Sequence, residues 1–493
     1  MASPAFPSFS PARPPCMGAY CLITSGTMDA SEIRSKFADY FTSKGHARLE
    51  RAPLILKDDP TTLFTSAGMQ PLLPYLLGRP HPEGTRLTDV QPCFRAQDLE
   101  DVGDSRHTTF FEMLGNWSLG DYFKDEQIHW FFNFLVDEVG LDPSRLYVTV
   151  FAGNDEYGIP QDDEAARIWQ GLFESRGIEA KIVNLGDPAI GDERGVKPGE
   201  RIFMYDDSQN WWSRGGGLAD TPIGDPCGPD SEVFYDFGEE HQDPSFGKAH
   251  PASDGGRFME IGNQVFMQYR RNEDGTFQLL DRKNVDFGGG LERIAAAASD
   301  TPDIFKISLL QPTVAALEGI SGATYEENTE AMRVIADHLR AAVFLAADGD
   351  IPSNKEQGYV LRRLIRRAVR YAHDLGVDEN MFERIVPTIV ATYADSYPFL
   401  AEKEDEIVAV LVKEERAFRR TLNKGLKEFK RHASSELTGE EIFTLYDTYG
   451  FPKELSVEEA VNRGVPLAPN WEEQFQEKME EQRNRSRGAR KNP

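Results

Sequence analysis

Cysteine is scarce in this chain of 493 residues. The four that occur are Cys16, Cys21, Cys93 and Cys227, and no two of them stand in a Cys-x-x-Cys spacing. A disulfide framework or a cysteine-based zinc site is therefore not expected. Free cysteines fit a reducing compartment, which favours a cytoplasmic location.

Long apolar runs and an excess of positive charge are lacking as well. No stretch approaches the ~20 apolar residues that a membrane span needs, so no membrane partner is expected. Lysine and arginine number 54 against 81 acidic residues, giving a net charge of −27. Such a balance argues at first against a nucleic-acid partner, but net charge governs solubility and long-range steering more than local contacts.

One cluster of basic residues stands out between Tyr359 and Tyr371. On a helix these residues would share one face, with apolar residues supplying another. Two interpretations stay open: contact with nucleic-acid phosphates, or a basic face paired with acidic neighbours. The cluster consists of Arg362, Arg363, Arg366, Arg367 and Arg370.

The chain divides into three parts by pattern. Residues 1–27 are rich in Pro, Ser and Ala without helical periodicity, and we expect a disordered extension. Residues 28–302 begin with an expected helix cap at Asp29 and then alternate β-rich pieces with Gly, Pro and Asp loops. With few helices between these pieces, the pattern predicts an antiparallel sheet flanked by helices. Strands are expected at 146–151, 201–205, 232–237 and 258–269, and an irregular loop over 214–230.

Residues 303–493 change to helical periodicity. Met332, Ile335 and Leu339 mark an amphipathic helix ending near Gly349, and a longer one is expected from 402 to about 433. The fold class is therefore α+β, with an all-helical domain following the sheet domain.

The segment 95–123 carries the strongest chemical signal. An aromatic, apolar run lies beside Arg95, Arg106, His107 and Glu112 across a short acidic turn. Two β-like segments joined by this turn would put these groups on one wall. The set suits a nucleotide, because it offers a cation for phosphate, the Phe111 ring for a base and a carboxylate for an exocyclic amine.

A second signal is the run Gly288-Gly289-Gly290-Leu291-Glu292-Arg293. Glycines in a strand let a ligand approach the backbone closely, and the following residues would open a helix with Arg293 in its first turn. Taken alone, the run could also be a glycine turn capping a helix that packs on the sheet.

Together these segments resemble motifs 2 and 3 of class II aminoacyl-tRNA synthetases. Over about 28–490 the chain resembles the alanyl-tRNA synthetase family within that class. The further matching pieces are Leu63-Phe-Thr-Ser-Ala-Gly-Met69, Val334-Ile-Ala-Asp-His338, Pro352-Ser-Asn354, Gly358-Tyr-Val-Leu-Arg-Arg363 and Leu445-Tyr-Asp-Thr-Tyr-Gly-Phe-Pro452.

The resemblance implies a two-step reaction. L-Alanine attacks the α-phosphate of ATP to give alanyl-adenylate, which then passes its acyl group to the 3′ end of tRNA(Ala), releasing AMP and pyrophosphate. ATP and Mg²⁺ are the implied cofactors, with no zinc site expected in this chain; the Mg²⁺ ligands are not identified. A synthetase-like protein that activates alanine or binds tRNA without charging it is the alternative.

The resemblance also carries residue roles. Arg95 and Arg293 are the catalytic phosphate ligands. The ATP site comprises Arg95, His107, Phe111, Glu112, Gly290, Glu292 and Arg293. The alanine pocket comprises Trp212, Asn263, Val265, Asp286 and Gly288, with Asp286 facing the ammonium group.

In the helical half, the resemblance implies that Asn354 and Asp447 read a G·U pair of the acceptor stem, while the five arginines contact the RNA backbone. Two departures from the family's pattern are a short motif 2 loop after Arg95 and an insertion at 214–223 beside Trp212. The insertion is expected to act as a lid over the site. The family's editing domain and oligomerisation region would follow the helical part, so the chain as given is expected to be a monomer without editing.

Overall fold

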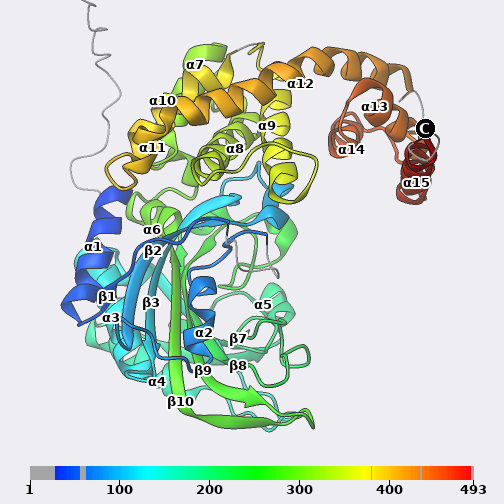
Figure 1. The fold of residues 1–493 in the computed structure, drawn as a ribbon. Coiled ribbons are helices and arrows are strands. Elements are labelled where there is room, and N and C mark those ends of the chain that lie inside the picture. Colours follow the sequence, from blue (N-terminus) through cyan, green and yellow to red (C-terminus); the bar gives the residue numbers. More distant parts are fainter. Residues whose placement is uncertain (1–27, 56–62, 379, 433–435, 490–493) are drawn as a thin grey trace, which may run out of the picture.

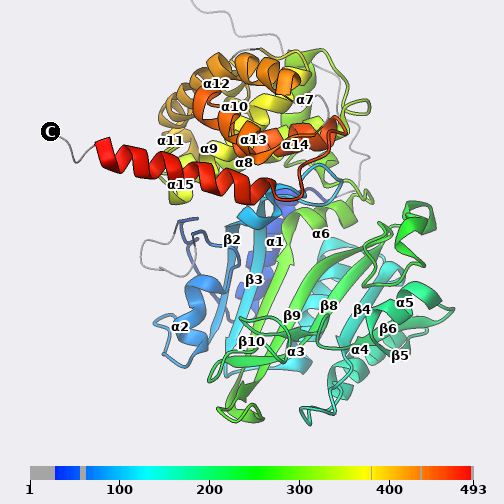
Figure 2. The ribbon, with the colours of Figure 1, turned by 90° about the vertical axis from the view of Figure 1, so that its right-hand side faces the viewer.

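The computed structural model describes residues 28–55, 63–378, 380–432 and 436–489. The expected disordered extension at 1–27 lies outside the described residues. The described chain forms a sheet domain and, on one end of it, a layered set of helices (Figure 1). A second view, turned by 90°, shows the strands side by side below these helices (Figure 2).

A ten-stranded sheet forms the centre of the first domain. Its strands are β1 (Ala47–Arg48), β2 (Arg86–Phe94), β3 (Phe110–Leu119), β4 (Leu146–Phe151), β5 (Lys181–Gly186), β6 (Glu200–Tyr205), β7 (Trp211–Trp212), β8 (Pro226–Asp236), β9 (Phe258–Arg271) and β10 (Phe277–Gly290). The order is β1-β2-β3-β10-β9-β8-β4-β6-β5, with β7 paired to β8. The central strands are antiparallel, which confirms the predicted sheet.

Parallel pairing appears at both edges, where β1 pairs with β2 and β6 pairs with both β4 and β5. The sequence did not predict it. Helix α4 (Asp163–Ser175) lies between β4 and β5 along the chain and supplies the crossover that a parallel connection needs.

Strand β8 begins earlier than expected. The sequence predicted an irregular loop up to residue 230, but β8 starts at Pro226 and its register shifts between Cys227 and Asp230. Gly228 makes this possible, since a Cβ there would lie 1.9 Å from the Phe266 carbonyl oxygen. A bulge in a strand tolerates Pro and Gly that would otherwise indicate a loop.

Helices cover the sheet and fill the chain's second half. Those of the sheet domain are α1 (Ala30–Ser43), α2 (Leu73–Leu76), α3 (Lys124–Asn133, continued by a π-helix at Phe134–Val139), α4, α5 (Pro188–Arg194) and α6 (Leu291–Ala298). Short 3-10 turns lie at Gln70–Leu72, Ala96–Leu99, Pro143–Arg145, Glu239–His241, Pro244–Phe246 and Ile304–Lys306. The expected cap of α1 is present, since Asp29 and Glu32 bond each other's backbone N–H groups.

The helical half comprises α7 (Gln311–Ser321), α8 (Thr329–Ala347), α9 (Glu356–Asp374), α10 (Met381–Tyr393), α11 (Phe399–Glu402), α12 (Glu404–His432), α13 (Gly439–Tyr449), α14 (Lys453–Asn462) and α15 (Trp471–Ala489). The predicted helices over 332–349 and 402–433 correspond to α8 and α12. The long α12 extends away from the sheet and leads to α13, α14 and α15, which we call the C-terminal helical unit (Figure 1). No helix of the described residues has the length and apolarity that a membrane crossing demands.

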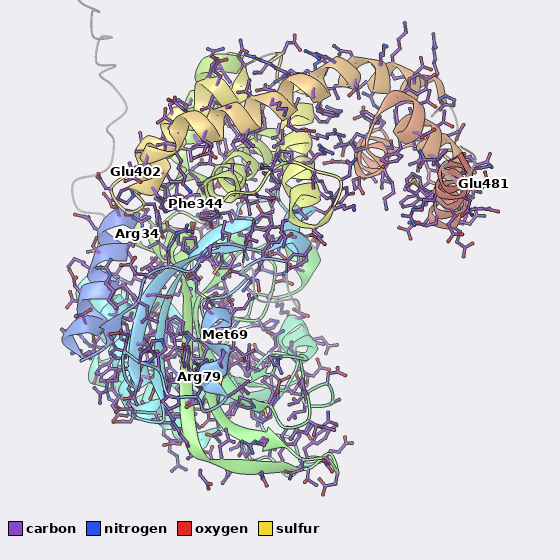
Figure 3. All side chains as sticks on the ribbon, viewed as in Figure 1. Arg34, Met69, Arg79, Phe344, Glu402 and Glu481 are labelled. Carbon is purple, nitrogen blue, oxygen red and sulfur yellow. The ribbon has the colours of Figure 1, made fainter. Side chains whose placement is uncertain are left out.

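Buried side chains of β3 contact both α1 and the helical half. Arg34 of α1 donates from Nε and Nη2 to Glu112 of β3 at 2.8 and 2.6 Å. Phe344 of α8 stacks on Phe110 of β3 with ring centroids 4.3 Å apart. In Figure 3, Arg34 and Phe344 lie together where the helices meet the sheet. Strand β3 is therefore held by α1 on one side and by the helical half on the other.

Candidate active site

The two segments singled out in the sequence lie on neighbouring strands. β10 runs antiparallel to β3, with Gly288 opposite Gly115 and Gly290 opposite Met113. A cavity opens above them; its lining includes Arg95, Asp98, Arg106, His107, Thr108, Phe111, Met113, Glu260, Gly288, Gly290, Glu292, Arg293 and Ile304. The structure thus places six of the seven residues predicted for ATP around one cavity.

Glycines on β10 and β3 leave the sheet surface at this site without side chains. A Cβ at Gly288 would lie 3.0 Å from the sulfur of Met113, and one at Gly115 would lie 2.2 Å from the Trp117 ring. Side chains at either position would push into the space above the sheet. A ligand can therefore approach the backbone of β10 and β3 closely.

Cationic groups surround the cavity. The guanidinium of Arg95 lies over the Phe111 ring, 4.9 Å from its centroid, and Arg95 Nε donates to the Ser66 carbonyl at 3.2 Å. Arg293 Nη1 donates to the Glu260 carbonyl at 3.1 Å. His107 Nδ1 bonds Asp104 at 2.6 Å, and this bond raises the pKa of the imidazole. Such a set can neutralise phosphate oxygens.

Carboxylates line the neighbouring hollow. Glu232 of β8 and Glu260 of β9 are among its lining residues, and the buried Asp230 of β8 lies near them. Burial, with repulsion from Glu260 and Asp230, raises the pKa of Glu232 well above its usual range. Among the described residues, no group of three or more His, Cys, Asp or Glu side chains is arranged to hold a metal by itself. Glu232 and Glu260, which line this hollow together with Arg106 and Arg293, could still share a divalent ion with ligand oxygens.

Two predicted ATP ligands have other partners. The Glu112 carboxylate is fully buried in its bonds to Arg34 and points away from the cavity. Glu292 borders the cavity, but its carboxylate accepts from Arg340 of α8 at 2.8 Å and from the Glu112 N–H at 3.1 Å. The predicted bond from Glu112 to an adenine amine does not fit this geometry. Neither the Glu112 nor the Glu292 carboxylate is therefore part of the ATP site that we propose.

The residues predicted for alanine converge by strand register. Asp286 of β10 stands opposite Trp117 of β3 on one side and Val265 of β9 on the other, while Asn263 stands opposite Gly288. Trp212 packs against the apolar cluster that contains Trp117 and Val265. Burial raises the pKa of Asp286 to about 7, although Trp117 Nε1 donates to its Oδ1 at 2.7 Å. The register thus brings an acidic group, Asp286, beside apolar neighbours on β3 and β9.

Trp117 and Asp89 are residues of this region that the sequence analysis missed. Asp89 of β2 stands opposite Gly115, is 5% exposed, and its Oδ1 has no hydrogen-bond partner. Burial and the Asp286 charge raise the pKa of Asp89 well above its usual range. An acid in the middle of an apolar strand was the signal that could have identified it.

The insertion at 214–223 contributes no residue to the cavity lining given above. Arg214 pairs with Asp225 at 2.5 Å, and Arg271 of β9 donates to the carbonyls of Ala219 and Thr221 at 2.7 and 2.8 Å. These bonds hold the insertion against the end of β9. Its role as a lid stays a prediction.

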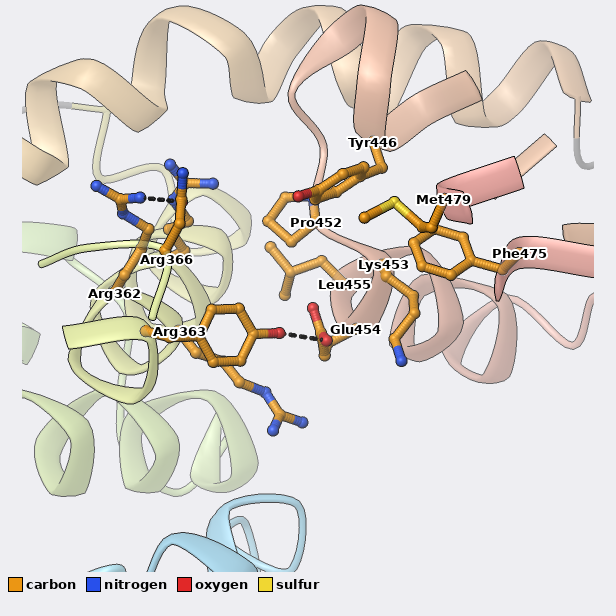
Figure 4. Close-up of a pocket in the computed structure, with 12 residues that line it drawn as sticks. Arg362, Arg363, Arg366, Tyr446, Pro452, Lys453, Glu454, Leu455, Phe475 and Met479 are labelled. Carbon is orange, nitrogen blue, oxygen red and sulfur yellow. Dashed lines mark hydrogen bonds between the residues drawn. The ribbon is translucent and has the colours of Figure 1, made fainter. Parts of the chain in front are cut away.

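A groove lies between α9 and the C-terminal helical unit. Its lining includes Asn354, Tyr359, Arg362, Arg363, Arg366, Tyr446, Pro452, Lys453, Glu454, Leu455, Phe475 and Met479 (Figure 4). Of the two predicted RNA readers, Asn354 lines the groove and accepts a bond from Arg362. Asp447, on α13, is not among these lining residues; it accepts a bond from Gln482 of α15.

The five arginines of α9 are engaged in ion pairs, one of the two interpretations left open above. Arg362 and Arg366 bond Glu414 of α12, Arg363 bonds Glu100, Arg367 bonds Glu458, and Arg370 bonds Glu459 and Asp374. Arg367 and Arg370 are only 6% and 8% exposed. RNA contact therefore remains geometrically open for Arg362, Arg363 and Arg366 alone.

Comparison with known proteins adds an independent line. Residues 32–493 match the family model described as tRNA synthetases class II (A). An alanine–tRNA ligase from Treponema denticola is 42% identical over 473 residues, which cover 93% of this chain and 72% of that protein. The one from Borrelia hermsii is 40% identical, covering 92% and 73%. The one from Geobacillus thermodenitrificans is 40% identical over 94% of this chain and 49% of its own length.

The resemblance found in the motifs is thus confirmed by whole-chain similarity. This chain spans about three quarters of two of these relatives and about half of the third. It belongs to the class II tRNA synthetases (A) family, together with the alanine–tRNA ligases.

Proposed function

We propose that this chain is an ATP-dependent alanine–tRNA ligase. It joins L-alanine to ATP as alanyl-adenylate and transfers the alanyl group to the 3′ end of tRNA(Ala), releasing pyrophosphate and then AMP. The observation that supports the proposal is the pairing of β3 with β10, which puts Phe111, Gly290 and Asp286 on one sheet face, beside the cavity lined by Arg95 and Arg293.

In the first step the amino-acid carboxylate is the nucleophile, so the protein has to position and neutralise rather than attack. Arg95 neutralises the α-phosphate and Arg293 the γ-phosphate, with His107 beside them. Adenine stacks on Phe111, and Arg95 leaves that ring as it turns to the phosphate. The backbone of Gly290 lets the nucleotide lie against β10.

Mg²⁺ fits the acidic hollow beside Arg293. Glu232 and Glu260 would hold it together with phosphate oxygens. Burial, and then the charges of Glu260 and Asp230, raise the pKa of Glu232, and a bound cation would offset both effects. When bound, the ion supplies charge neutralisation on the phosphoryl oxygens.

Alanine binds with its ammonium group at Asp286. The apolar walls given by Val265, Gly288 and Trp212 accept a methyl group, and the amide of Asn263 fixes the carboxylate end. Such a pocket rejects glycine and serine poorly, because one methyl or hydroxyl group changes binding by only ~1–3 kcal/mol.

For the second step, the acceptor stem of tRNA(Ala) enters the groove between α9 and the C-terminal helical unit. Asn354 and Asp447 accept from the guanine 2-amino group of a G·U pair, which A-form RNA displays in its wide minor groove. Arg362, Arg363 and Arg366 line the groove or border it and contact phosphates. All residues named for both steps come from one chain, so a monomer suffices; the location proposed for it is the cytoplasm.

Alanine-dependent exchange of pyrophosphate into ATP tests the first step. Charging of acceptor-stem minihelices carrying G·U or G·C then tests the second. Exchange without charging would favour a protein that activates alanine without transferring it. Equal charging of both minihelices would contradict the roles given to Asn354 and Asp447.

A further inference from the structure

The guanidinium of Arg367, on α9, bonds three separate parts of the molecule. Nε donates to Glu458 of α14 at 2.9 Å, and Nη1 donates to the Leu99 carbonyl at 2.8 Å. Nη1 also lies 3.0 Å from Nε2 of His338 on α8. A planar guanidinium can hold several acceptors in fixed directions, which suits it to this junction.

The donor and acceptor roles in the hydrogen bonds of His338 are fixed. Arg367 can only donate, so His338 Nε2 accepts and the ring proton sits on Nδ1. That Nδ1–H donates to Asp337 Oδ2 at 3.0 Å. Burial lowers the pKa of His338, which keeps the imidazole in this neutral form.

Asp337 carries the chain of bonds into the sheet. It accepts from the Thr109 N–H at 3.0 Å and from the Thr109 hydroxyl at 2.6 Å. The Thr109 carbonyl in turn accepts from the backbone N–H of Arg95 at 2.8 Å. Leu99, which Arg367 bonds directly, lies four residues after Arg95 in the same loop. The loop 95–109 is therefore tied to one buried guanidinium at two points, directly at Leu99 and, through His338 and Asp337, at Thr109.

We propose that Arg367 is a positioning residue for Arg95 and couples the C-terminal helical unit to the ATP site. It fixes the loop that presents Arg95 to the α-phosphate, and through Glu458 it ties that loop to α14, which borders the groove proposed for tRNA. The inference rests on the proposed function. It replaces the phosphate contact predicted for Arg367 with a role that its burial permits.

Arg370 provides a matched control on the same helix. It is buried to a similar extent, and its Nε donates to Glu459 of α14 at 2.9 Å, with a further bond to Asp374. These recorded partners lie on α14 and α9, not on the loop or α8. Arg370→Lys thus disturbs the α9–α14 contact without the link to Arg95.

The first test compares Arg367→Lys with Arg370→Lys in alanine-dependent ATP–pyrophosphate exchange, below the melting temperature of both. A lysine ammonium keeps the charge but cannot span three acceptors as the planar fork does. We expect kcat of exchange to fall about tenfold in Arg367→Lys. In Arg370→Lys it should stay within about twofold of the wild type. Exchange needs no tRNA, so loss of an RNA contact would not produce this difference.

The second test cuts the link at α14. Glu458→Gln should lower kcat for charging a G·U minihelix about fivefold with its KM unchanged, whereas Glu459→Gln should leave kcat within about twofold, since only the former reaches the loop. Should Arg367→Lys fail to fold, His338→Leu interrupts the same series of hydrogen bonds between Arg367 and Asp337. The same fall in kcat of exchange is expected.

Equal exchange by Arg367→Lys and Arg370→Lys, or an effect of Glu458→Gln confined to KM, would overturn the inference while the proposed function stands. Wild-type protein without exchange would instead contradict the proposed function and the inference with it.

Discussion

On the substrate face of the sheet, buried carboxylates keep oxygens that accept no hydrogen bond from the protein. In the groove beside α9, by contrast, the arginines are already paired with glutamates. Asp89 Oδ1 has no partner and Asp286 is bonded only through Trp117, yet Arg362 and Arg366 share Glu414. An unpaired buried acid is costly and is relieved when a cationic ligand binds. A paired arginine must give up a partner before it binds anything else.

The two regions should therefore differ in how they respond to substitution. On the sheet face, removing one group removes a ligand contact that nothing replaces. In the groove, RNA competes with bonds inside the protein, so the net effect of one residue is smaller.

The largest effect is expected for Arg293→Ala. Arg293 borders the ATP cavity, and among the residues that the structure describes its hydrogen bonds go to the Glu260 carbonyl and carboxylate through Nη1, which leaves its other donors for phosphate. Removing one preorganised charge donor costs ~10²–10³ in rate, and we expect alanine-dependent exchange to become undetectable. Melting temperature serves as the control, and near-normal exchange would refute the assignment.

Asp286→Asn comes next. An amide keeps the shape and the contact with Trp117 but loses the charge that faces the alanine ammonium group. A charge-assisted bond contributes ~1.5–3 kcal/mol, so KM for alanine should rise roughly 10- to 100-fold with a smaller change in KM for ATP. A comparable rise for both substrates would point to general damage of the site.

The same carboxyl predicts a pH dependence. Its pKa is raised to about 7 by burial, so below that pH it is protonated and cannot pair with the ammonium group. KM for alanine should therefore rise as pH falls through about 7, and the rise should be absent in Asp286→Asn. A KM that stays flat between pH 6 and 8 in the wild type would contradict a raised pKa at this site.

Much of the sheet domain could be predicted from the sequence, because strands such as 146–151 combine β-branched and aromatic residues between clear loop signals. Of the site residues, Arg95, Phe111 and Gly288 could be identified from the spacing of the motifs. Glu112 and Arg367 could not be assigned in this way, since their partners Arg34 and Glu458 lie 78 and 91 residues away in the chain. Whether a charge faces a ligand or another side chain is decided by such distant partners.

A smaller effect, on stability, is expected for Asp89→Asn. In the wild type the raised pKa of Asp89 means that the folded protein favours the protonated acid, so its contribution to stability falls as pH rises above the unfolded value near 3.8. The amide does not titrate. We expect the melting temperature of the variant to exceed that of the wild type increasingly from pH 5 to pH 8; a constant difference would argue against a buried, protonated Asp89.

The smallest effect is expected beside the groove, for Gln482→Ala, since neither Gln482 nor its partner Asp447 is a lining residue. The Gln482 amide donates to Asp447 where the guanine 2-amino group would donate, so α15 and RNA compete for one carboxylate. Both residues lie at the surface, where such a bond contributes about 0.5 kcal/mol net, equivalent to a two- to threefold change in binding. KM for a G·U minihelix should fall by that factor while exchange and kcat stay unchanged. A larger fall in KM would mean that the bond between Gln482 and Asp447 is stronger than a surface bond of this kind. A rise in KM would mean that Gln482 contacts the RNA and does not compete with it.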